Sequence, residues 1–176
     1  MVKKIVAVSL CVMLGNTLYA REVSQNEKII GIEVGYGTIQ ADNQFSPVIG
    51  ELDHVASDVQ FGFRIGAQQK EWRTLLVADY FNSTDDDQQY IKGFLELDYF
   101  VIQDSALKPF IGANVGYMNY QTTAIDESGL LYGGQAGVSY RVSDAVDMDV
   151  MYRYSFSTAN STNHIEGIIF GLNYIY

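Results

Sequence analysis

The sequence predicts an all-β fold, an antiparallel up-and-down barrel of eight strands. Three observations predict it. After about residue 28 the chain repeats runs of about ten residues in which apolar side chains alternate with polar ones or glycine. No run has the 3.6-residue period of a helix. The breaks between runs are alternately long and short, as expected where odd and even connections lie at opposite ends of a barrel.

The first four runs each keep this alternation, which places the apolar side chains on one face of a strand. They lie near 28–39, 55–66, 71–82 and 89–101. Their apolar rows are, in order, Ile30, Ile32, Val34, Tyr36; Val59, Phe61, Phe63, Ile65; Trp72, Leu76, Ala78, Tyr80; and Leu95, Leu97, Tyr99, Val101.

The last four runs follow the same rule and lie near 108–119, 129–141, 145–157 and 165–176. The final run is "IEGIIFGLNYIY", whose apolar row ends on two tyrosines. The four rows are Ile111, Ala113, Val115, Tyr117; Tyr132, Ala136, Val138, Tyr140; Val146, Met148, Val150, Tyr152, Tyr154, Phe156; and Ile168, Phe170, Leu172, Tyr174, Tyr176.

Run length and loop length both favour a membrane barrel. Tilted membrane strands need about 9 to 11 residues, whereas strands of ordinary globular proteins centre on about 5 to 6. Outer-membrane barrels also have long outer loops and short turns on the other side. The long breaks, which we expect to be the outer loops, lie around 40–54, 82–89, 119–129 and 157–165.

The opposite rows decide which face is outside. They contain most of the 16 glycines and also long charged side chains. Eight strands leave a lumen that side chains just fill, so large charged groups fit only where the facing wall is small. We therefore predict a transmembrane barrel with its apolar rows against lipid. The predicted interior charge network is Glu33, Asp58, Arg64, Arg73, Asp79, Lys92, Glu96, Asp98, Arg141, Asp147, Asp149 and Arg153.

Residues 1–20 have the layout of a secretory signal peptide. Lys3 and Lys4 precede an apolar run that is too short to span a bilayer, and small and polar residues lead to Ala20, where we expect cleavage. The single barrel domain is then 21–176. Cys11, the only cysteine, is removed, so no disulfide is expected.

The mature chain has 9 basic and 21 acidic residues, a net charge of −12, which argues against nucleic acid as a partner.

Two segments resemble the OmpA/OmpX-like family of small outer-membrane β-barrels: "LKPFIGANVGY" and "YGGQAGVSYRVSDAVDMDVMYRYSF". The resemblance implies an eight-stranded barrel in the outer membrane of a Gram-negative bacterium, inserted by the outer-membrane assembly machinery. It further implies that this machinery recognises the last strand, here Phe170, Leu172, Tyr174 and Tyr176. Members of the family have many roles, so the resemblance indicates fold and location better than task.

Three groups of residues bear on a chemical function. The interior charges form either a salt-bridged plug or a conductive path, and the narrow bore of an eight-stranded barrel favours the plug. The predicted interior has seven acidic and five basic residues, so any conductance should prefer cations. Asp85, Asp86 and Asp87 lack the spacing of a calcium loop and read as a solvated acidic loop. His54 and His164 stand near hydroxyl and acidic residues, but no matched nucleophile supports an enzyme.

The sequence therefore predicts a non-enzymatic integral outer-membrane barrel with a structural or surface role and without cofactor or metal. Its expected partners are the lipid bilayer, lipopolysaccharide and the assembly machinery, and we expect a monomer. One alternative is a surface adhesin or host-interaction protein that acts through its outer loops. The other is a small soluble ligand-binding barrel of the periplasm.

Overall fold

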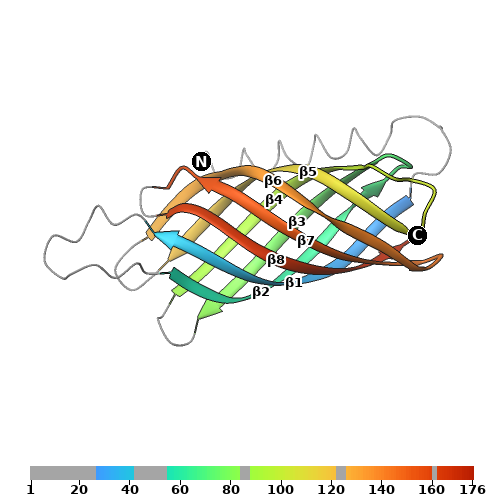
Figure 1. Ribbon diagram of the computed structural model, residues 1–176. Coiled ribbons are helices and arrows are strands. Elements are labelled where there is room, and N and C mark those ends of the chain that lie inside the picture. Colours follow the sequence, from blue (N-terminus) through green and yellow to red (C-terminus); the bar gives the residue numbers. More distant parts are fainter. Residues whose placement is uncertain (1–26, 42–54, 84–87, 122–125, 160–161) are drawn as a thin grey trace, which may run out of the picture.

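Eight antiparallel strands close into a barrel in the computed structural model, which describes residues 27–41, 55–83, 88–121, 126–159 and 162–176 (Figure 1). This confirms the predicted fold class. The strands are β1 (Glu27–Ala41), β2 (Val55–Gln68), β3 (Trp72–Ser83), β4 (Gln88–Phe100), β5 (Leu107–Gln121), β6 (Asp126–Ser143), β7 (Val146–Ser157) and β8 (Thr162–Ile175).

Each strand pairs with the next along the chain, and β8 pairs with β1 to close the barrel. The closure continues one residue past the end of β8. Lys28 N donates to Tyr176 O at 3.0 Å, and Tyr176 N donates to Lys28 O at 3.0 Å. Because the sheet is closed, its described strands leave no unpaired edge, which is the condition for backbone to lie in lipid.

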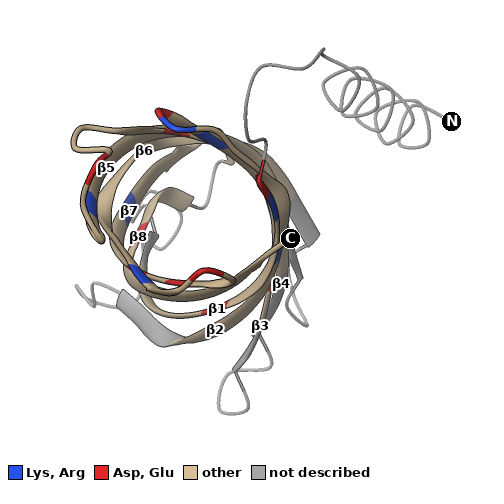
Figure 2. Ribbon diagram, turned by 90° about the vertical axis from the view of Figure 1, so that its right-hand side faces the viewer, with Lys and Arg blue, Asp and Glu red and all other residues tan. Residues whose placement is uncertain are grey.

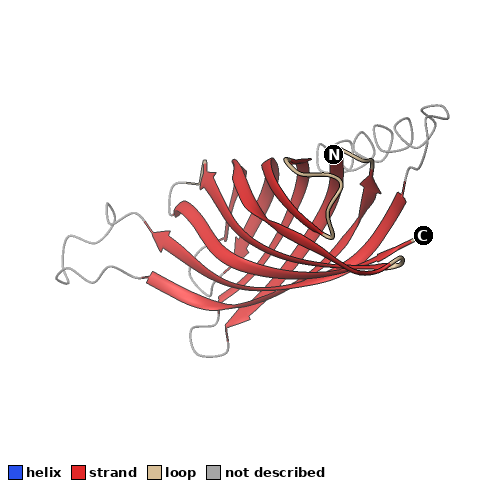
Figure 3. Cartoon of the chain, turned by 45° about the vertical axis from the view of Figure 1, so that its right-hand side comes forward, coloured by secondary structure: helices blue, strands red, loops and turns tan. Residues whose placement is uncertain are grey.

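The connections β2–β3, β4–β5 and β6–β7 lie at one end of the barrel, together with the start of β1 and the end of β8 (Figures 1 and 3). We call this the turn end and the opposite one the loop end. Strands β6 and β8 begin three residues earlier than their predicted runs, because backbone pairing such as Gln121 with Asp126 continues beyond the apolar rows. The connecting residues 42–54, 84–87, 122–125 and 160–161 lie outside the described part.

Alternate residues face inward and outward along each strand, and β7 shows this most simply. Asp149, Met151 and Arg153 are buried, whereas Val150 and Tyr152 are exposed. The same phase holds around the barrel, so the predicted apolar rows face outward and the charged rows face inward. Figure 2 looks along the barrel from the turn end and shows acidic and basic positions distributed around the wall.

The interior also contains apolar side chains, which were not predicted there from the sequence. Most of them form two buried clusters. The first consists of Ile29, Leu75, Val77, Phe94, Met118, Leu131, Ile165 and Ile175, and the second of Phe100, Phe110, Met151 and Ile169. These residues share rows with the buried charges and fill the space between them. The interior is therefore a mixed core rather than a purely polar one.

Glycine makes room for charged interior side chains at two positions. A Cβ atom on Gly171 of β8 would lie 2.1 Å from Nη1 of Arg64, and one on Gly62 of β2 would lie 2.1 Å from Oδ1 of Asp79. Both distances are far inside van der Waals contact. The wall must therefore be bare at these points for the charged groups to fit.

Candidate functional site

Ten of the twelve predicted interior charges are buried. They are Glu33, Arg64, Arg73, Asp79, Lys92, Glu96, Asp98, Asp147, Asp149 and Arg153. Arg141 is only half-buried, because it lies at the turn end, where the barrel opens. The side chain of Asp58 lies outside the described residues.

The buried charges gather around two carboxylates, or foci, and Asp149 on β7 is the first. Its carboxylate accepts hydrogen bonds from Arg64 Nη1 at 2.7 Å and from Arg73 Nη1 at 2.9 Å. Asn173 Nδ2 on β8 donates to the same oxygen at 2.8 Å. Charge-assisted bonds of this kind are the strong ones, and here they connect four strands across the lumen.

Glu33 on β1 lies at the second focus. It accepts a hydrogen bond from Arg64 Nε at 2.6 Å and another from Arg153 Nη1 at 3.0 Å. Arg153 also contacts Glu96 and lies 3.3 Å from Asp79 Oδ2. Since Arg64 contacts both Asp149 and Glu33, the two foci form one continuous network.

Aromatic rings shield the cations of this network. The Arg153 guanidinium lies 4.9 Å from the ring centre of Phe94, and Lys92 Nζ lies 5.7 Å from it. Arg73 lies 4.7 Å from the ring centre of Phe110. These are cation–π distances, so the rings both stabilise the charges and exclude water from them.

Neutral polar residues that were not predicted from the sequence extend the network. Gln135 Nε2 donates to Asp98 Oδ1 at 2.7 Å, Asn114 Nδ2 donates to Gln135 Oε1 at 2.9 Å, and Ser155 Oγ donates to Asn114 Oδ1 at 2.8 Å. Lys92 Nζ donates to Gln60 Oε1. All of these residues occupy the inward rows, so alternation would have found them had it been applied to amides as well as charges.

A separate cluster closes the turn end. Arg141 on β6 donates to both carboxylate oxygens of Glu27 on β1, at 2.9 and 2.8 Å, and to those of Asp147 on β7, at 2.8 and 3.1 Å. Gln68 Nε2 adds a bond of 3.2 Å to Glu27. Glu27 precedes the first predicted run, which is why it was not predicted. The cluster joins the start of the barrel to its sixth and seventh strands.

One small cavity lies inside the described barrel, beside the charge network. A cavity beside Gln60, Lys92 and Arg153 has a volume of about 10 Å³, which is at most enough for a single water molecule. The central network contains five acids (Glu33, Asp79, Glu96, Asp98, Asp149) and four bases (Arg64, Arg73, Lys92, Arg153). This near-balanced, buried arrangement fits a plug.

The outward rows form a belt of exposed apolar side chains around the barrel. Among them are the four residues of the predicted assembly signal: Phe170, Leu172, Tyr174 and Tyr176 are 46 to 60 % exposed. Nearer the loop end, two polar contacts lie within this belt: Tyr152 donates a hydrogen bond to Glu166, and the His164 ring stacks on the Tyr154 ring with the ring centres 5.0 Å apart.

The remaining candidate groups do not come together in the described residues. His164 stacks on an aromatic ring, while His54 and the acidic run Asp85 to Asp87 lie outside the described part. Across the described strands, no group of three or more His, Cys, Asp or Glu is placed to hold a metal ion. The described residues also include no helix long and apolar enough to cross a membrane.

A closed eight-stranded up-and-down barrel with buried charges and an apolar exterior is the architecture of the small integral outer-membrane proteins. Solved structures agree. The chain is similar to Neisserial surface protein A, with a TM-score of 0.65 and 16 % identity over 84 % of this chain and 96 % of that one.

Two structures from Pseudomonas aeruginosa are similar as well. Outer membrane protein H gives a TM-score of 0.58 and 19 % identity, and the N-terminal β-barrel domain of OprF gives 0.53 and 14 % identity. Each match covers 85 % of this chain and 99 % of the other. The sequence itself matches no family model and no curated protein. At these identities the similarity is one of fold.

Proposed function

We propose that this chain is an integral outer-membrane β-barrel with a packed polar interior, and that it holds the segments at its loop end at the cell surface. The observation that carries the proposal is the reversed polarity of the molecule. Arg64, Arg73 and Glu96 are fully buried, while Ile32, Phe61 and Tyr36 on the outer wall are about 60 % exposed.

Lipid rather than water suits such a wall. Monomeric soluble proteins rarely expose contiguous apolar patches of more than a few hundred Å². Here exposed large apolar side chains lie on the outer wall of all eight strands. A soluble ligand-binding barrel would direct this row inward around a cavity, whereas the interior near Arg153 holds only about 10 Å³ of free space.

Aromatic residues support the same orientation. Trp72, Tyr140 and Tyr176 lie on the outer wall near the turn end, and Tyr36 and Tyr117 lie on it nearer the loop end. Trp and Tyr are enriched at both membrane interfaces, where the ring contacts apolar chains and the polar tip contacts headgroups. The two levels of aromatics would therefore mark the two interfaces, with the turn end in the periplasm.

The packed interior favours a supporting role over transport or catalysis. A network that engages inward residues from all eight strands makes the barrel rigid, and the cavity beside Arg153 holds only about 10 Å³. In this proposal the barrel is a non-enzymatic monomer whose outer wall contacts phospholipid on one side and lipopolysaccharide on the other.

Fractionation tests the proposal. The full chain, expressed with residues 1–20, is expected in the outer-membrane fraction, resistant to alkaline extraction, with a gel mobility that changes on boiling in detergent. Val150→Arg puts a charge on the outer wall, which costs about 2–4 kcal/mol near the bilayer midplane, and should lower the folded membrane fraction. Asp144→Arg in the exposed β6–β7 turn is the matched control. A water-soluble chain without a heat-modifiable band would refute the proposal.

A further inference from the structure

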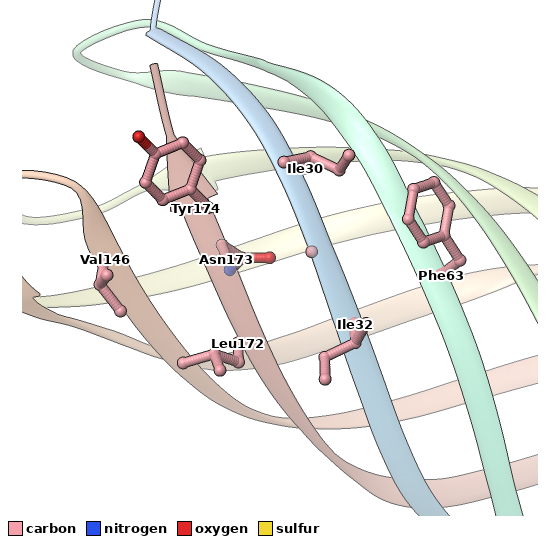
Figure 4. A pocket seen from close by; sticks show the side chains of 8 residues that line it. Ile30, Ile32, Phe63, Val146, Leu172, Asn173 and Tyr174 are labelled. Carbon is pink, nitrogen blue, oxygen red and sulfur yellow. The ribbon is translucent and has the colours of Figure 1, made fainter.

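The outer wall has a depression where β1 and β8 close the barrel. It has a volume of about 360 Å³, and its sides are Ile30, Ile32 and Phe63 on one flank and Val146, Leu172 and Tyr174 on the other (Figure 4). Its floor is the pair Gly31 and Asn173, neither of which places a side chain on the outer face. We call this depression the seam groove.

The seam groove is apolar and begins close to the turn end. Ile30 pairs with Tyr174, and Ile32 pairs with Leu172 one step further along the outer row. The Tyr174 hydroxyl lies on the side of the groove toward the end of β8 (Figure 4). The seam groove is therefore an apolar recess on the outer wall, with its polar margin toward the turn end.

A cation lies at that margin. Lys28 is exposed, belongs to the same outward row as Ile30, and precedes it by about 7 Å along the strand. Its Nζ lies 6.0 Å from the ring centre of Tyr176. Within the described residues no carboxylate lies in salt-bridge range of Lys28, whereas Lys70 at the same end pairs with Asp104 at 3.1 Å.

We propose that the seam groove binds one glycerophospholipid of the leaflet at the turn end. The Lys28 ammonium binds the phosphate, the tyrosine hydroxyls lie at the level of the headgroup, and one acyl chain fills the apolar channel. Lysine is a well-established phosphate binder, and basic sites beside membrane-spanning segments bind lipid headgroups. The inference rests on the proposed membrane insertion.

The shape and charge of the groove favour a lipid over a second copy of the chain. A stable protein interface buries about 800 Å² on each partner and needs a matching surface. The seam groove is a recess between protruding side chains, which suits a thin flexible chain. A cation at its margin complements a phosphate, but would face its own copy across a two-fold interface.

Photolabelling of the full-length barrel in bilayers tests the inference. The probe is phosphatidylglycerol with a diazirine on one acyl chain, and labelled sites are mapped by mass spectrometry. Val146→Trp fills the groove and is compared with Val150→Trp, which is on the same strand and outside it. Lys28→Gln is compared with Lys70→Gln. Diacylglycerol carrying the same label shows which effects need the phosphate.

The expected result is labelling concentrated on the groove segments of β1, β2, β7 and β8. Val146→Trp should reduce it severalfold and Val150→Trp should not. Lys28→Gln should reduce phosphatidylglycerol labelling about fivefold, as expected for one basic group at the surface, and leave diacylglycerol labelling unchanged. Labelling spread evenly around a folded, inserted barrel would overturn the site alone, as would a crosslinked dimer through this wall. A chain that fails to insert would overturn the membrane assignment as well.

Discussion

Asp149 on β7 accepts a hydrogen bond of 2.7 Å from Arg64 on β2, although β8 and β1 lie between these two strands in the wall. The same carboxylate accepts a second arginine, Arg73 from β3. One short side chain thus connects parts of the barrel that share no backbone hydrogen bonds. The closed wall fixes the circumference, and Asp149 holds its opposite sides together.

Replacing Asp149 with alanine should be strongly destabilising. It would leave the guanidinium of Arg73 with one carboxylate partner and remove one of two from Arg64. Breaking a buried ion pair costs about 3–5 kcal/mol, because an uncompensated charge remains in a low-dielectric site. Urea unfolding in lipid vesicles, followed by the fluorescence of Trp72, measures this cost. Asp144→Ala, at an exposed turn, is the control and should change the free energy of unfolding by about 0.5 kcal/mol or less. A similarly small loss for Asp149→Ala would mean that water compensates the arginines.

The same methyl group added at two glycines should have different effects. In Gly171→Ala the new Cβ would meet Arg64 Nη1 at 2.1 Å, whereas in Gly93→Ala the nearest atom is Val77 O at 3.7 Å. Arg64 cannot move away freely, since Glu33 and Asp149 hold it. We expect a loss of about 1–3 kcal/mol for Gly171→Ala, the usual cost of overpacking, and a near-neutral effect for Gly93→Ala. Equal losses at the two sites would show that backbone flexibility, not space, explains these glycines.

Alternation along the chain was sufficient to predict the strands and their number, whereas the glycines and charges of the opposite rows were needed to predict which face is outside. A period of two is a local property, so it can be read without knowing which strands meet. The strand ends were less predictable, because pairs such as Gln121 with Asp126 are held by backbone bonds that no apolar pattern marks. The start of β8 at Thr162 has the same explanation.

The members of the interior could be predicted from the sequence, but their partners could not. Arg64 and Asp149 are 85 positions apart, and only the closed barrel brings them together. Apolar residues such as Phe94 were missed because they occupy the charged rows, where they shield Lys92 and Arg153. Lys28 was not predicted as a binding residue, because its proposed role depends on the seam groove that forms only where the first and last strands pair.

Removing the Arg153 side chain should open a narrow cation path. Arg153 lies between Glu33, Asp79 and Glu96, so Arg153→Ala leaves three carboxylates around a new cavity. In planar bilayers the wild-type barrel should show no resolved conductance, since its interior is filled. The variant should show small, cation-selective steps, and Lys70→Ala at the exposed turn should behave like the wild type. Anion-selective steps from the variant would contradict a path lined by the three carboxylates. Large steps from the wild type would contradict the plugged interior.

Tyr176 offers a way to separate assembly from stability. Tyr176→Ala keeps the two backbone hydrogen bonds to Lys28 that close the barrel, but removes the terminal ring. If the assembly machinery reads that ring, the folded fraction in cells should fall severalfold, while refolding of the purified chain into vesicles stays close to normal. The control is Tyr140→Ala, which removes a ring with 50 % exposure from the outer wall near the same end of the barrel. Each variant loses the contact of one aromatic ring with the membrane interface, so the two should lose similar stability in vitro. An equal fall in cells for the two variants would assign the effect to lost lipid contact, and the role of Tyr176 as a signal would be refuted.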